Sequence, residues 1–167
     1  IVERKNLLSL IKAIKIINKK KLVVIGNGNI YKKKCINYIK KNNLENKVIL
    51  KSGYNTEEIA IAYRNASIFV YPSLCEGFGI PIIEALYSKV PVITTKGGCF
   101  EEAGGNYTKY IDTKNISEII AAINEIDSNP SLRKKMIEKG FSHAKTFNDK
   151  SVNKKLYSIY NELLQAK

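Results

Sequence analysis

Cysteine and histidine are scarce in this chain, and their scarcity argues against two kinds of site. The 167 residues include three cysteines, with no C-x-x-C spacing, and His143 is the one histidine. An odd number of widely spaced cysteines favours neither a disulfide framework nor a zinc site. No cluster of acids or cysteines surrounds His143 in the sequence, so we predict no metal site. Free thiols are typical of a reducing compartment, which favours a cytoplasmic location.

Arginine is also rare, although the chain is strongly basic. The formal net charge is +13, but Arg4, Arg64 and Arg133 are the only arginines. Lysine is a hydrated point charge and is less suited than arginine to bidentate recognition of phosphate. The surplus therefore indicates a solvated, lysine-rich surface, and we predict no nucleic-acid partner. If the surplus charge has a ligand, anionic lipid headgroups are favoured.

Long apolar runs are missing as well. The longest ones are far shorter than the roughly 20 residues that a membrane-spanning helix needs, and the sequence opens without a signal-peptide pattern. We therefore predict no membrane span. A peripheral association with the inner face of the membrane, through the basic surface, stays open.

Two glutamates eight positions apart flank a glycine-rich turn in EGFGIPIIE. Glu76 follows an apolar, strand-like segment at 67–71, and Glu84 lies in a helical pattern that opens with Pro81. A helix N-terminus after glycines offers free N–H groups and the positive end of the macrodipole, which suit a diphosphate near 78–80. Carboxylates beside an anion bind hydroxyls, so the pattern predicts a nucleotide-sugar. The alternative is a solvated loop acid and an acid placed by the helix dipole.

Several segments together resemble one enzyme family. They are EGFGIPIIE, PVITTKGGCFEEAGG after it, RKN near the start, IGNG at Ile25 and SGYNTEEIAIAYRNA. They are similar to the E-x7-E signature and the C-terminal, donor-binding domain of retaining glycosyltransferases of family 4, which have the GT-B fold. The resemblance covers nearly the whole chain. It implies transfer of a hexose from a nucleoside-diphosphate sugar with retention, in surface polysaccharide or glycan biosynthesis, without a metal or other cofactor.

The resemblance also assigns roles to residues. Glu76 would face the donor hexose and the reacting centre, as nucleophile or as orienting group, and Glu84 would bind the ribose hydroxyls. Lys5, with Arg4 beside it, would neutralise the diphosphate. The remaining donor-binding candidates are the turn residues Gly77, Phe78, Gly79 and Ile80, the glycines Gly26 and Gly28, and Tyr54, whose ring would stack on the base.

The residues alone leave some of these roles open. Gly26 and Gly28 equally fit a plain strand-to-helix turn, and an aromatic after a strand, such as Tyr54, is more often a core residue. A dinucleotide-binding oxidoreductase is disfavoured, because the third glycine of its fingerprint is missing and the next strand ends at Lys51 instead of an acid. Glu102, in GGCFEEAGG, is predicted to be structural and to act as a cap.

The apolar pattern alternates between strand-like and helical segments. We predict strands at about 21–26, 48–50, 67–71, 90–94 and 108–111. We predict helices at about 3–19, 30–41, 57–65, 80–88, 116–127, 131–147 and 152–166. Strands separated by helices favour an α/β, Rossmann-like, doubly wound parallel sheet with its ligand at the carboxyl ends of the strands. IGNG, the E-x7-E segment and TTKGG all follow such ends.

With 44% hydrophobic residues, 167 residues can bury one sizeable core. We therefore predict a single Rossmann-like nucleotide-sugar-binding domain over 1–167. It would be the C-terminal half of a two-domain transferase, inactive without the N-terminal domain that binds a saccharide or lipid-linked acceptor. The alternatives are a non-catalytic nucleotide-sugar-binding module, the donor subunit of a two-chain transferase, and a sugar-nucleotide epimerase of the same fold.

Overall fold

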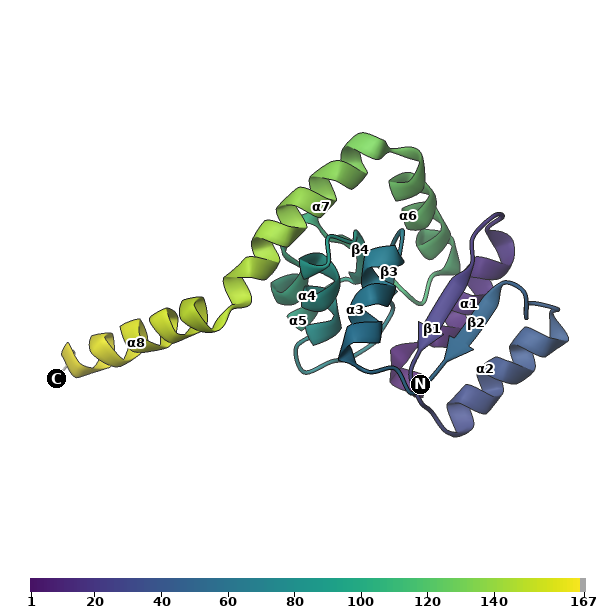
Figure 1. Ribbon diagram of the computed structural model, residues 1–167, viewed down its shortest axis with the longest axis horizontal. Coiled ribbons are helices and arrows are strands. Elements are labelled where there is room, and N and C mark those ends of the chain that lie inside the picture. Colours follow the sequence, from purple (N-terminus) through teal and green to yellow (C-terminus); the bar gives the residue numbers. More distant parts are fainter. Residues whose placement is uncertain (166–167) are drawn as a thin grey trace.

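The computed structural model describes residues 1–165, in which strands and helices alternate up to residue 128 and only helices follow (Figure 1). The strands are β1 (Leu22–Ile25), β2 (Val48–Lys51), β3 (Phe69–Tyr71), β4 (Val92–Thr95) and β5 (Lys109–Ile111). The helices are α1 (Leu7–Ile16), α2 (Ile30–Lys41), α3 (Thr56–Asn65), α4 (Ile80–Tyr87), α5 (Cys99–Gly104), α6 (Ile116–Ser128), α7 (Pro130–Ala144) and α8 (Asp149–Gln165). The described residues also include three short 3₁₀ turns: η1 (Glu3–Lys5), η2 (Gly105–Tyr107) and η3 (Lys145–Phe147).

All strand pairs are parallel, which confirms the predicted α/β class. β1 pairs with β2, and β3, β4 and β5 form a second group with β4 in its centre. The ladder is thus divided in two, whereas the sequence predicts one sheet. β3 is three residues long and, among residues 1–165, it pairs with β4 alone, while Val23 of β1 is 53% exposed. The carboxyl ends of the strands still precede the glycine turns, as predicted.

Two apolar clusters form the core. The first joins α1, α2 and α6 to β2, and the second joins α4, α5 and β4 to the end of α7. In α1 the buried residues Leu7, Leu10, Ile11 and Ile14 recur at helical spacing, so one face of the helix is apolar and packs on α6. Figure 1 shows α1 and α2 beside β1 and β2, and α3 to α5 beside β3 and β4.

The first predicted helix is broken near its start. The sequence predicts a helix at 3–19, but residues 3–5 form the turn η1, Asn6 adopts the left-handed conformation with φ 51°, and α1 begins at Leu7. Asparagine tolerates this conformation because its short polar side chain bonds locally or to nearby backbone. Here the Asn6 amide donates to the carbonyl of Thr113 at 2.8 Å. Lys5 therefore lies before the α-helix and not in its first turn.

The last helix projects away from the rest of the molecule (Figure 1). It begins at Asp149, three residues earlier than predicted, because Asn148 caps it by accepting from the Ser151 N–H at 2.9 Å. The predicted end at Ala166 lies outside the described residues. None of its described side chains is buried.

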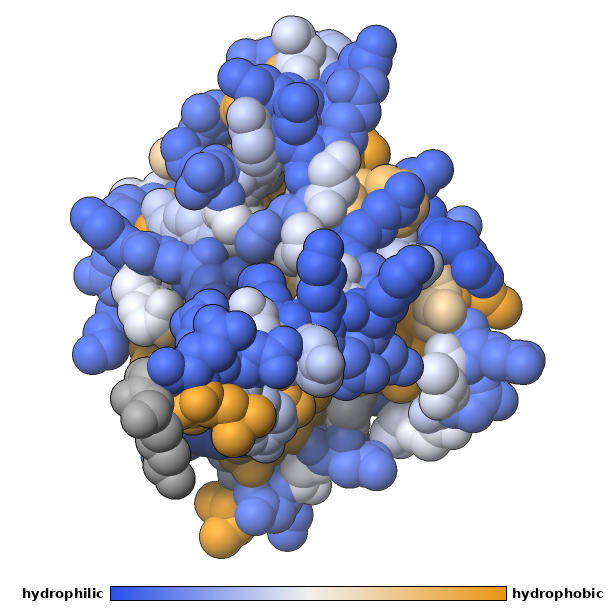
Figure 2. All heavy atoms as spheres, turned by 90° about the vertical axis from the view of Figure 1, so that its left-hand side faces the viewer, coloured by the Kyte–Doolittle hydropathy of each residue, from blue (hydrophilic) through white to orange (hydrophobic). Residues whose placement is uncertain are grey.

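Seen from the left-hand side of Figure 1, the surface of the molecule is mainly hydrophilic with a few hydrophobic areas (Figure 2). No described helix is both long and apolar enough to cross a bilayer.

Candidate active site

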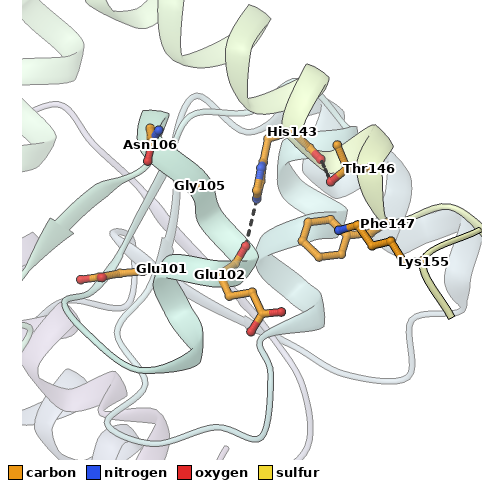
Figure 3. Close-up of a pocket in the computed structure, with 8 residues that line it drawn as sticks. All are labelled: Glu101, Glu102, Gly105, Asn106, His143, Thr146, Phe147 and Lys155. Carbon is orange, nitrogen blue, oxygen red and sulfur yellow. Dashed lines mark hydrogen bonds between the residues drawn. The ribbon is translucent and has the colours of Figure 1, made fainter. Parts of the chain in front are cut away.

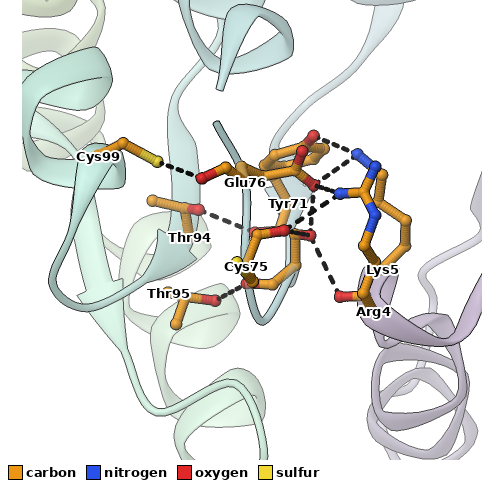
Figure 4. A network of polar contacts seen from close by, with 9 residues as sticks. Arg4, Lys5, Tyr71, Cys75, Glu76, Thr94, Thr95 and Cys99 are labelled. Carbon is orange, nitrogen blue, oxygen red and sulfur yellow. Dashed lines mark hydrogen bonds and ion pairs between the residues drawn. The ribbon is translucent and has the colours of Figure 1, made fainter. Parts of the chain in front are cut away.

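The carboxylate of Glu76 is the centre of a dense polar cluster at the carboxyl end of β3 (Figure 4). Its Oε1 atom lies 2.6 Å from Nζ of Lys5 and 2.7 Å from Nη1 of Arg4. The hydroxyl of Ser73 donates to the same oxygen. The resemblance assigns all three charged residues to one ligand, and the structure brings both cations into direct contact with Glu76.

Backbone contacts hold η1 against the loop that carries Glu76. The carbonyl of Arg4 accepts from the Leu74 N–H at 2.7 Å, and the Ser73 hydroxyl, which donates to Glu76, lies 3.2 Å from the same carbonyl. The guanidinium of Arg4 also donates to the carbonyl of Cys75 at 3.1 Å. The cations therefore reach Glu76 from a segment whose backbone is fixed to the same loop, and their positions do not depend on the ion pairs alone.

Glu76 is ionised at any pH near neutrality. Its side chain is only 10% exposed, and this burial alone would raise its pKa. The hydrogen bonds from Lys5, Ser73, Arg4 and Tyr71 outweigh burial and lower the pKa from 4.5 to about 2. Burial also raises the pKa of Tyr71, although Lys5 opposes this by donating to its hydroxyl at 2.6 Å.

The turn before α4 has the geometry predicted from its glycines. Gly79 is the N-cap, with φ 107° and ψ 40°, and Pro81 is the second residue of the helix. The Ile82 N–H donates back to the Gly79 carbonyl at 2.8 Å. The ring of Phe78 packs edge-on against Phe147, with centroids 5.6 Å apart. The free N–H groups of a helix start thus lie directly after the loop of Glu76.

Glu84 does not lie in the first turn of α4, where its closeness to Pro81 in the sequence would put it. It is the fifth residue of α4 and therefore belongs to the second turn, because the helix begins at Ile80. Its exposed carboxylate accepts a hydrogen bond from the hydroxyl of Tyr63 on α3, at 3.1 Å. Since the second turn is away from the orphan N–H groups, the helix dipole does not explain an acid here.

The other candidates lie at the ends of β1 and β2. Gly26 follows β1 with φ 149°, and its N–H donates to the Lys51 carbonyl at 3.0 Å. A side chain at Gly28 would collide with the backbone of Ile1, whose amino group donates to the Asn27 carbonyl. Tyr54 follows β2 and is half-buried. These residues share the carboxyl edge with Glu76 but take no part in its cluster of hydrogen bonds.

The chain is similar to glycosyltransferases in sequence over most of its length. Residues 1–143 match the family model described as glycosyl transferases group 1. The chain belongs to this family. An uncharacterised glycosyltransferase of Methanocaldococcus jannaschii is 34% identical over 84% of this chain. The O-antigen chain mannosyltransferase B of Escherichia coli is 31% identical over 64% of it. The chain spans 40% and 28% of the lengths of these two relatives.

Solved structures agree on the fold. The C-terminal domain of a glycosyl transferase group 1 family protein from Francisella tularensis has a TM-score of 0.76 and 29% identity, covering 88% of this chain and 81% of that one. Sucrose-phosphate synthase from Thermosynechococcus elongatus has a TM-score of 0.86 at 21% identity, over 99% of this chain and 44% of that one. The predicted Rossmann-like fold of a GT-B glycosyltransferase domain is therefore confirmed.

Some residues of this group 1 domain carry contacts that the sequence does not reveal. Ser73 and Tyr71 both contact the Glu76 cluster, and nothing in their spacing marks them. The cap predicted for Glu102 is not formed, since none of the described side chains caps α5; its neighbour Glu101 accepts from the Gly97 N–H at 3.0 Å, just before the helix. A thiol also supports the loop, because Sγ of Cys99 donates to the Glu76 carbonyl at 3.3 Å.

A separate pocket lies at the end of α7 (Figure 3). It has a volume of about 350 Å³, and its lining includes Glu101, Glu102, His143 and Phe147. The His143 ring contacts the Glu102 carbonyl, with its Nε2 atom 2.9 Å away. This pocket shares no residue with the predicted donor site, although Phe147 touches Phe78. Within residues 1–165 no three histidine, cysteine or acidic side chains gather as metal ligands would.

Proposed function

We propose that this chain is the donor-binding domain of a retaining glycosyltransferase of family 4, marked by the E-x7-E pair Glu76 and Glu84. The observation that carries the proposal is the cluster of Arg4, Lys5 and Glu76 at the carboxyl end of β3, beside the start of α4. Parallel α/β folds bind nucleotides at this edge. Two cations and a helix N-terminus suit a diphosphate, and a carboxylate beside them suits a sugar hydroxyl.

The proposed ligand is a nucleoside-diphosphate sugar. Its diphosphate would bind Arg4, Lys5 and the backbone at Gly77, Phe78, Gly79 and Ile80. Glu84 would meet the ribose, and Gly26, Gly28 and Tyr54 would line the nucleotide side. A neighbouring structure, Anabaena Alr3699/HepE, was solved with UDP and glucose; its TM-score of 0.82 at 19% identity supports a common fold. A hexose is the proposed sugar.

Transfer would depend on stabilising the leaving diphosphate. Negative charge grows on it as the glycosidic bond breaks, and preorganised cations stabilise such charge. Lys5, Arg4 and the N–H groups at the start of α4 would supply that stabilisation. Glu76 would stand at the sugar, where a single carboxylate acts either as a nucleophile or as an orienting group. No step of this mechanism requires a metal ion.

The whole protein's role is proposed from its relatives. Two of them are named as an O-antigen chain mannosyltransferase of Salmonella typhimurium and a capsular polysaccharide biosynthesis glycosyltransferase of Staphylococcus aureus. We extend this to a hexosyltransferase of surface polysaccharide or glycan biosynthesis, working in the cytoplasm at the inner face of the membrane. A further domain would bind the saccharide or lipid-linked acceptor, and residues 1–167 alone would bind the donor without transferring it.

Isothermal titration calorimetry tests the donor site directly. The 167-residue chain is titrated with UDP, GDP and ADP and with a hexose ester of each. We expect saturable binding of at least one nucleotide family at millimolar concentration or below, and loss of that binding in Lys5→Ala. Absence of heat and of thermal stabilisation with every nucleotide and every sugar ester would contradict the proposal.

A further inference from the structure

Glu76 holds both cations that the proposed function assigns to the diphosphate. Lys5 and Arg4 share the single oxygen Oε1, at 2.6 Å and 2.7 Å. The side chain of Glu76 is 10% exposed, whereas those of Lys5 and Arg4 are 32% and 53% exposed. The carboxylate is thus the inner member of the cluster. A diphosphate approaches from the solvent side and meets two cations whose charge is already shared with an acid.

Binding of a diphosphate therefore involves an exchange of partners. Each cation that turns toward phosphate weakens its pair with Glu76, and a largely buried carboxylate that loses its cations is costly. Ser73 and Tyr71 would remain as its hydrogen-bond donors. Because Ser73 is fully buried, its hydrogen bond anchors the Glu76 carboxylate on the inner side of the cluster during the exchange.

The sugar decides how costly the exchange is. A nucleotide-sugar brings hydroxyl donors to Glu76, and these replace the N–H donors that it gives up. A bare nucleoside diphosphate brings none, so its binding leaves the carboxylate under-satisfied. The free diphosphate also carries roughly one more negative charge near pH 7, because its terminal phosphate has a second pKa near 6. A basic site would by itself favour that species, and Glu76 opposes this preference.

We propose that Glu76 determines specificity by competing with the ligand for Arg4 and Lys5, so that the site selects sugar-bearing nucleotides over bare nucleoside diphosphates. This inference rests on the proposed function and goes further in one respect. It makes the same carboxylate that faces the sugar the reason why the spent nucleotide leaves. Since the bare diphosphate is the product of glycosyl transfer, the exchange limits inhibition by product.

The test compares paired ligands on matched variants. Dissociation constants of UDP, GDP and ADP and of their hexose esters are measured by calorimetry for the wild-type chain, Glu76→Gln and Glu45→Gln. Glu45 is an exposed acid in the turn before β2, at the opposite ends of the strands, so its removal changes the net charge equally without touching the cluster. Circular dichroism checks that each variant is folded.

The expected result is that Glu76→Gln loses the preference for the sugar ester. The wild-type chain should bind the sugar ester of its nucleotide at least about tenfold more tightly than the bare diphosphate. Glu76→Gln should bind the bare diphosphate about three- to tenfold more tightly than wild type and lose the preference for the ester. Glu45→Gln should match wild type in both.

Three results would overturn the inference, and they are distinguishable. If no variant binds any nucleotide, the proposed function fails and this inference fails with it. If nucleotides bind but Glu76→Gln binds the bare diphosphate no better than wild type, the donor site stands and the competition does not. If Glu76→Gln fails to fold, the wild-type ratio decides: equal or tighter binding of the bare diphosphate than of its esters overturns the competition.

Discussion

The hydroxyl of Tyr63 on α3 donates a hydrogen bond to the carboxylate of Glu84 on α4, at 3.1 Å. Burial raises the pKa of Tyr63, and the charge of Glu84 raises it further, so the phenol stays protonated and remains a donor. The same hydroxyl lies 3.4 Å from the Pro81 carbonyl. Tyr63 thus ties the start of α4 and the proposed ribose ligand to one point, and it acts as a positioning residue for Glu84.

Removing Glu84 should weaken nucleotide binding through the ribose. A hydrogen bond to a charged acceptor contributes about 1.5 to 3 kcal/mol, so Glu84→Ala should lower affinity roughly ten- to hundredfold. The loss should vanish when the ligand is a 2′,3′-dideoxynucleotide, which has no hydroxyls to offer. Tyr63→Phe should show a smaller loss of the same kind. If Glu84→Ala weakened the dideoxy ligand equally, Glu84 would not contact the ribose.

Lys5→Ala should reduce affinity for a nucleoside diphosphate much more than for the nucleoside. The lysine is about one third exposed, and charges near solvent are screened over about 8 Å at physiological ionic strength. The effect should therefore shrink as salt is raised in the titration. Lys40→Ala is the matched control, because Lys40 is exposed at the far end of α2. Lys20 is a poorer control, since it pairs with Asp127. Equal losses in Lys5→Ala and Lys40→Ala would indicate general basicity only.

The sequence predicts regular elements well and single-residue breaks poorly. α2 lies at the predicted residues because its apolar positions repeat over three turns, and α4 begins where Pro81 and Gly79 indicate. The break at Asn6 depends on one backbone conformation, which leaves no periodic trace. α5 has six residues between glycines and is too short for a helical pattern to show.

For the candidate site, too, the sequence predicts some features and not others. The resemblance names Glu76, Lys5 and Arg4, but only as groups that share a ligand. The contacts of Glu76 with Lys5 and Arg4 join residues more than 70 positions apart. They are possible because the Arg4 carbonyl accepts from the Leu74 N–H, which fixes η1 against the loop of Glu76. No local spacing encodes such a contact. Tyr71 and Ser73 were missed for the same reason, since in the sequence the first is the last residue of a strand and the second is an ordinary loop residue after it.

Acid should remove the contribution of Glu76 to stability. Its pKa falls from 4.5 to about 2 on folding, so the carboxylate stabilises the folded state above pH 4.5 and loses this effect as the pH falls toward 2. The free energy of unfolding of wild type should therefore exceed that of Glu76→Gln at pH 7. This difference in stability should narrow as the pH falls from 4.5 toward 2. Urea unfolding at a series of pH values measures it. A difference that stays constant down to pH 2 would contradict the low pKa.

Two glycines of the same turn should differ in how well they tolerate a methyl group. Gly79 has φ 107°, a conformation that alanine rarely adopts, and a Cβ there would lie 3.2 Å from the buried side chain of Ile82. Gly77 has no positive φ, and a Cβ there would meet nothing within 4 Å. Gly79→Ala should destabilise the chain by about 1 to 3 kcal/mol, while Gly77→Ala should change stability by about 0.5 kcal/mol or less.

The same substitution should affect ligand binding. Because the backbone conformation of Gly79 also sets the direction of the N–H groups at the start of α4, Gly79→Ala should weaken diphosphate binding even at a temperature where it is fully folded. Denaturant unfolding and calorimetry with the same nucleotide separate the two effects. If Gly79→Ala were as stable as Gly77→Ala and bound diphosphate like wild type, the start of α4 would not be the phosphate-binding element.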